Sequence, residues 1–129
     1  LNWDDVVTRK TLLRGALPHV DIFMPSGDEL LYALDRPRFG QGDALTAADL
    51  QPLSAALIDM GVAVVGIKLG ARGIYIRTAA AVRLERMGLA RPARLVPNTT
   101  LGLPEVSSDF RTFTLRIRPG IWFQDDPAF

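Results

Sequence analysis

Two glycines that follow an apolar run form the first group of residues that could bind a ligand. The run ends at Leu69, and Gly70 and Gly73 follow it closely. Glycine lets the backbone adopt a positive φ and approach a ligand closely. The spacing leaves two interpretations open: a plain hairpin turn, or a turn that also seats a phosphate-bearing ligand.

A second group lies upstream, where Pro25 ends another short apolar run. Ser26 and Glu29 have the S-x-x-E spacing of a capping box, in which a hydroxyl and a carboxylate accept backbone N–H groups at a helix start. A helix cap is the simplest interpretation. However, both groups directly follow the ends of expected parallel strands, and doubly wound sheets bind ligands at that edge. Position therefore favours a binding site that contains Ser26, Glu29, Gly70 and Gly73.

An alternation of helices and strands over residues 1–90 supplies the framework for these groups. Apolar periodicity predicts helices over 4–17, 28–34 and 79–87, and strands over 20–24, 62–69 and 74–78. A further helix is expected between Thr46, which starts a second capping box, and Gly61, a left-handed C-terminal residue. The first two strands are joined through helices and should be parallel, whereas the third should form a hairpin with the second. The pattern predicts a fragment of a layered α/β domain.

Composition excludes several classes of function. The chain has 129 residues, enough for one domain, and its net charge of +1 does not favour a nucleic-acid or membrane-surface partner. It has no cysteine, which removes disulfides, thiolate metal sites and a cysteine nucleophile. His19 is the single histidine and gives little support to a histidine metal site or a Ser-His-Asp triad. No apolar run reaches the roughly 18 residues that span a bilayer.

Two segments together carry a resemblance to a known family. VDIFMPSGDELLYAL (Val20–Leu34) and GVAVVGIKLGARGIYIRT (Gly61–Thr78) resemble the middle of a PfkB-family carbohydrate kinase. These ribokinase-like enzymes phosphorylate sugar hydroxyls with ATP, and the resemblance covers residues 3–88. It implies part of a three-layer α/β sandwich with parallel strands and one hairpin. It also implies ATP and Mg²⁺ as cofactors, a sugar substrate and a cytoplasmic location.

The same resemblance gives roles to individual residues. The family has an N-x-x-E motif that helps to organise Mg²⁺ and phosphates, and Ser26 and Glu29 occupy its ends, with serine in place of asparagine. Its T-x-G-x-x-G nucleotide segment corresponds to Lys68, Gly70 and Gly73, with lysine in place of the usual threonine. Two interpretations of this lysine stay open: a charge that faces the phosphates, or a solvated strand end. The resemblance thus implies nucleotide contacts from these five residues and an indirect metal contact from Glu29.

The family's catalytic motif is missing. In the family, a G-A-G-D segment after the hairpin provides an anion hole and the aspartate that deprotonates the sugar hydroxyl. No G-A-G-D segment occurs in this sequence, so no catalytic residue is assigned. We expect an incomplete piece of a kinase that is inactive alone. Its open sheet edges should favour self-association.

The tail has a different character. Residues 95–129 resemble an N-terminal segment of the extracellular peptide-binding receptors of ABC transporters, and Phe113, Leu115 and Ile117 alternate as in a strand. The two resemblances imply different compartments, so we expect a fused or rearranged reading frame with a junction at 91–94. The alternative function is therefore a non-enzymatic, extracytoplasmic solute-binding fragment.

Overall fold

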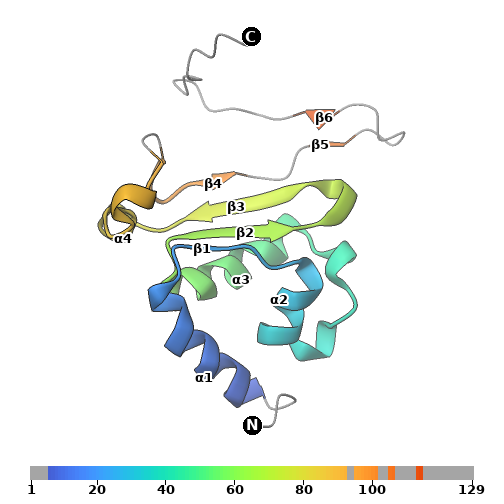
Figure 1. Cartoon of the computed structure of the whole chain (residues 1–129). Coiled ribbons are helices and arrows are strands. Elements are labelled where there is room, and N and C mark those ends of the chain that lie inside the picture. Colours follow the sequence, from blue (N-terminus) through green and yellow to red (C-terminus); the bar gives the residue numbers. More distant parts are fainter. Residues whose placement is uncertain (1–5, 93–94, 102–104, 107–112, 115–129) are drawn as a thin grey trace.

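The computed structural model describes residues 6–92, 95–101, 105–106 and 113–114 (Figure 1). Its α-helices are α1 (Val6–Ala16), α2 (Gly27–Leu34), α3 (Ala47–Asp59) and α4 (Ala81–Glu85). Its strands are β1 (Ile22–Phe23), β2 (Val64–Lys68), β3 (Ile74–Thr78), β4 (Thr100–Leu101), β5 (Glu105–Val106) and β6 (Phe113–Thr114). Within this described part, no helix is both long and apolar enough to cross a membrane.

The first four strands form one mixed sheet in the order β1-β2-β3-β4. β1 and β2 are parallel, with Ile22 opposite Val64, while β2 and β3 form an antiparallel hairpin. β5 and β6 pair in a separate two-stranded sheet. The α/β class, the parallel pair and the hairpin that the sequence predicts are all confirmed.

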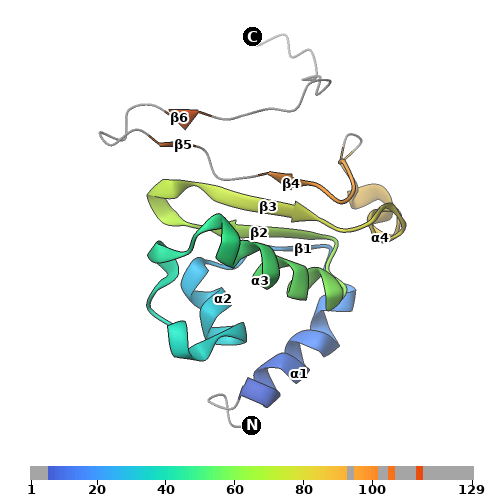
Figure 2. The same cartoon turned by 180° about the vertical axis from the view of Figure 1, so that it is seen from behind.

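One face of the sheet carries the main core. α3 packs against β2 and β3 on this face, in front of the sheet in Figure 2 and behind it in Figure 1. The central side chains are fully or almost fully buried: Leu30, Leu31, Leu50, Leu57, Val65, Ile67 and Tyr75. Burial of such aliphatic and aromatic surface is the main force that holds the helices on the sheet.

The opposite face of the sheet is less well covered. Ile22 and Met24 point away from the core and are 50% and 48% exposed. Gly66 is buried between the side chains of Met24 and Ile74, and a Cβ at this position would lie 3.2 Å from atoms of each. The side chains of Met24 and Ile74 thus cover Gly66, while the exposed surfaces of Ile22 and Met24 leave apolar area open on this face.

The sheet continues beyond the expected junction. The Thr78 N–H donates to the Thr99 carbonyl (3.0 Å), and the Thr78 hydroxyl donates to the Val96 carbonyl (2.7 Å). β4 then pairs with β3, so residues 96–101 lie along the edge of the same sheet. The sequence did not predict β4 or β5. Of the strand expected near Phe113, only Phe113–Thr114 falls in the described residues; the junction residues 93–94 and the remaining tail lie outside them.

Candidate functional site

The carboxyl ends of β1 and β2 lie side by side, as the sequence predicted. The Lys68 N–H donates to the Pro25 carbonyl at 2.9 Å, and Ser26 forms a parallel bridge with Lys68. Ser26 is also the N-cap residue of α2. The two separate sequence motifs therefore meet at one edge of the sheet, next to a helix start.

Ser26 and Glu29 form the predicted capping box. The Ser26 N–H donates to Oε2 of Glu29 at 2.6 Å, and the Glu29 N–H donates to the Ser26 hydroxyl at 3.2 Å. The hydrogen bond from the Ser26 backbone, then the Ser26 side chain, and finally the Lys68 charge lower the pKa of the Glu29 carboxyl. Glu29 is thus an ionised carboxylate at neutral pH, and its structural role as a cap is established.

The cap should make stability depend on pH in the acid range. Since folding lowers the Glu29 pKa below its ordinary value of 4.5, the stabilisation is complete above that pH and is lost as the pH falls through the folded-state pKa. Urea unfolding at neutral pH should therefore show Glu29→Gln to be less stable than wild type. The difference should shrink steadily below pH 4.5.

Glu85→Gln is the matched control, because it removes an exposed carboxylate from α4 and leaves the cap intact. The effect of Glu85→Gln on the free energy of unfolding should be small, and it should not shrink below pH 4.5 as the effect of Glu29→Gln does. An equal difference between wild type and Glu29→Gln at neutral and acid pH would contradict the role assigned to the cap.

Gly70 and Gly73 form the hairpin turn between β2 and β3. Both have positive φ angles, +58° at Gly70 and +90° at Gly73. The Gly73 N–H donates to the Gly70 carbonyl at 3.0 Å, and the Leu69 N–H donates to the Gly73 carbonyl at 2.9 Å. Gly73 combines its φ with ψ −145°, a region that is essentially restricted to glycine. The hairpin interpretation is confirmed, while a ligand contact stays a prediction.

Two residues that the sequence did not single out hold this turn and the neighbouring loop in place. The Arg72 guanidinium donates to the carbonyls of Asp43 (2.7 Å) and Leu45 (2.6 Å). Oδ1 of Asp28 accepts the N–H groups of Gly40 (3.1 Å) and Gly42 (2.9 Å). The loop before α3 is therefore fastened both to α2 and to the hairpin, which fixes the edge at which the candidate residues lie.

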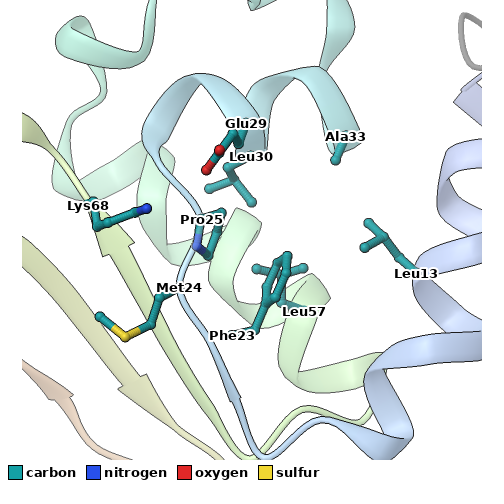
Figure 3. Close-up of a pocket in the computed structure, with 9 residues that line it drawn as sticks. All are labelled: Leu13, Phe23, Met24, Pro25, Glu29, Leu30, Ala33, Leu57 and Lys68. Carbon is teal, nitrogen blue, oxygen red and sulfur yellow. The ribbon is translucent and has the colours of Figure 1, made fainter.

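A pocket of about 310 Å³ adjoins this edge (Figure 3). Of the predicted site residues, Glu29 and Lys68 line it, whereas Ser26, Gly70 and Gly73 are not among its lining residues. Figure 3 shows the Glu29 carboxylate and the Lys68 ammonium directed toward one another beside Pro25. The other lining residues are Leu13, Phe23, Met24, Pro25, Leu30, Ala33 and Leu57.

The candidate residues do not form a metal cage of their own. The described residues contain no group of three or more His, Asp or Glu side chains that could hold an ion. Mg²⁺ is often bound through only one or two carboxylates together with phosphates and water. Glu29 fits that minor role, because the cap uses its Oε2 and leaves Oε1 for a further contact. Any Mg²⁺ would depend on a phosphate ligand for the rest of its coordination.

Comparison with known proteins finds no family that matches this chain and no curated protein with a similar sequence. The kinase-like and receptor-like resemblances therefore remain proposals.

Proposed function

We propose that the chain is a ribokinase-like α/β fragment of an ATP-dependent sugar kinase that binds nucleotide phosphates at the carboxyl edge of β1 and β2. The main support is the bridge between Ser26 and Lys68, which unites the two motifs that the resemblance connects with phosphates. This edge is also where open α/β sheets generally bind their ligands.

Lys68 is the principal phosphate-binding residue in this proposal. Its side chain is exposed at the end of β2, and the described chain gives it no direct ion pair. Gly70 and Gly73 carry no side chain, so that the backbone at these two positions can approach the ligand. Bound ATP would supply the transferable phosphoryl group, and Mg²⁺ would offset phosphate charge, with Glu29 held ionised nearby.

The fragment lacks the group that would deprotonate a sugar hydroxyl. The resemblance places that aspartate in a G-A-G-D segment that the sequence does not contain. Removal of a preorganised anion hole typically lowers a rate by about 10²–10³-fold, and loss of the base adds to this. We therefore propose binding without phosphoryl transfer by this chain alone.

Calorimetric titration with MgATP tests the proposal through two variants. Lys68→Ala should weaken binding by about tenfold, and more at low salt, because it removes a charged hydrogen-bond donor that salt screens. Gly73→Ala should also weaken binding under conditions where circular dichroism shows the variant to be folded, because a Cβ hinders close approach of the phosphates.

Arg86→Ala is the charge-matched control, since Arg86 is exposed just after α4, away from the candidate edge. It should bind MgATP as wild type does. Equal affinities of wild type, Lys68→Ala and folded Gly73→Ala would leave the motif as a hairpin with no role in nucleotide binding.

A further inference from the structure

β1 is an outer strand of the four-stranded sheet, and the side of β1 that faces away from β2 is its free edge. The sheet order places no described strand along this free edge. The carbonyls of Asp21 (2.8 Å) and Pro25 (2.9 Å) accept N–H groups of β2. Because alternate residues of a strand direct their backbone groups to the same side, Ile22 and Met24 direct theirs away from β2. Within the described part of the chain, these backbone groups have no hydrogen-bond partner.

The pocket of about 310 Å³ lies beside the free edge. Phe23 and Met24 both line it, although successive side chains of a strand point to opposite faces of the sheet. Figure 3 shows these two side chains on opposite sides of the β1 backbone. A cavity under one face would contact only one of them, so this pocket lies at the edge of the strand. Leu13 of α1 and Ala33 of α2 line it from either side.

The chemistry of the free edge suits one extended peptide segment. An outer strand exposes N–H donors and C=O acceptors at regular intervals, and an added strand satisfies them in turn. A second folded copy fits less well, because its own β1 is flanked by its own α1 and α2, and these helices would meet those of the first copy. A single extended segment has no such obstruction.

The size and charge of the pocket restrict the side chains of that segment. Leu30 and Leu57 are buried in the core, so they leave no deep slot for a large side chain. Among the described lining residues, the charged ones are Glu29 and Lys68, whose charges have opposite signs. The lining therefore favours neither an acidic nor a basic segment, and a charged side chain would lose hydration without gaining a partner.

We propose that the free edge of β1 binds an extended, uncharged peptide segment with small side chains, which joins the sheet as a further strand. The backbone N–H and C=O groups of the segment pair with those of Ile22 and Met24. Small side chains are required because α1 and α2 stand on either side of the pocket. This interaction goes beyond the proposed nucleotide function and needs neither Lys68 nor the hairpin turn.

An NMR titration of the whole chain with N-acetyl-tetraalanine amide, in the absence of nucleotide, tests the proposal. The amide resonances of Ile22 and Met24 should shift in a saturable manner, with a Kd of about 1 mM or tighter. The same peptide with every residue N-methylated keeps its side chains but loses its N–H donors, so it should bind at least about tenfold more weakly. Equal affinity of the two peptides, or no saturable shift at Ile22 and Met24, would overturn the proposal.

The competing occupant is a second copy of the chain. If the edge is free for a peptide, the resonances of Ile22 and Met24 should not depend on protein concentration when no peptide is present. Concentration-dependent shifts at these two residues would assign the free edge to a second copy and would refute peptide binding there.

Two substitutions at one position separate the Met24 backbone from its side chain. Met24→Pro removes the outward N–H and leaves the hydrogen bonds to β2 in place, since an edge strand accepts proline where its N–H faces away from the sheet. This variant should bind the peptide at least about tenfold more weakly. Met24→Ala keeps the N–H and should bind nearly as wild type does. Equal binding by folded Met24→Pro and Met24→Ala would count against the proposed pairing.

A pair of alanine variants locates the site without any change to β1. Ala33 lines the pocket from α2, so Ala33→Leu should fill it and abolish peptide binding. Ala48 is exposed on α3 and does not line the pocket, so Ala48→Leu should bind the peptide as wild type does. Undiminished binding by folded Ala33→Leu would contradict the assignment to this pocket. MgATP affinity is measured separately, so failure of the peptide site leaves the nucleotide proposal standing, and the reverse also holds.

Discussion

Leu57→Ala should lower the free energy of unfolding by about 2–5 kcal/mol, because it removes a side chain from the centre of the core and leaves a cavity. Leu57 is 0% exposed and belongs to the cluster that joins α3 to β2. Its side chain also borders the pocket, so the new cavity would be continuous with it. Urea unfolding followed by circular dichroism measures the effect.

Leu89→Ala is the matched control, since Leu89 is fully exposed in the Gly88–Ala90 turn. The same truncation there should change stability by no more than about 0.5 kcal/mol. Leu57→Met, which keeps most of the volume, should cost less than about 1.5 kcal/mol. Equal stabilities of Leu57→Ala and Leu89→Ala would contradict the core that the structure describes.

Gly61→Ala should destabilise the chain strongly. Gly61 follows α3 with φ +108°, and a Cβ there would lie 2.9 Å from Cα of Pro18. The backbone strain and the clash with another backbone atom act together, so we expect a loss of more than about 2 kcal/mol in the free energy of unfolding.

Gly15→Ala provides a control of the opposite sign. Gly15 lies inside α1, and a Cβ at this position would meet no atom within 4 Å. Alanine is the better helix former, so this variant should gain up to about 1 kcal/mol. Thermal unfolding of both variants distinguishes them, and a Gly61→Ala protein as stable as wild type would contradict the close approach of Pro18.

Local signals account for most of the fold that the sequence predicts correctly. The Ser26–Glu29 and Thr46–Asp49 boxes are confirmed because each needs only residues within one turn of helix. Gly61 marks the end of α3 for a similar local reason, because glycine readily adopts the positive φ found there. The parallel pairing of β1 with β2 could be predicted because strands that are joined through helices have a crossover connection, whereas a hairpin needs a short turn.

Long-range contacts explain what the sequence does not predict. The Arg83 guanidinium donates to the carbonyls of Gly61 (2.6 Å) and Val20 (3.1 Å) and to the Asp21 carboxylate (3.1 Å). No spacing in the sequence connects this arginine with those partners. β4 likewise becomes a strand through its pairing with β3, since the sequence around it has no strand periodicity.

The sequence also predicts one part of the candidate site and not another. The sequence predicts that Ser26, Glu29 and Lys68 meet, because strand order places both motifs at one edge. The pocket was not predicted, because its walls come from five separate elements and depend on how α1 packs against α2.

An NMR titration of the wild-type chain with MgATP tests the proposed phosphate site most directly. Backbone amide shifts at residues 26–29 and 68–73 should change in a saturable manner, while those of α4 should stay constant. The resonances of both segments should follow one binding curve, since Ser26 and Lys68 are bridged. Shift changes confined to other parts of the chain, or no saturable change at either segment, would contradict nucleotide binding at the carboxyl edge of β1 and β2.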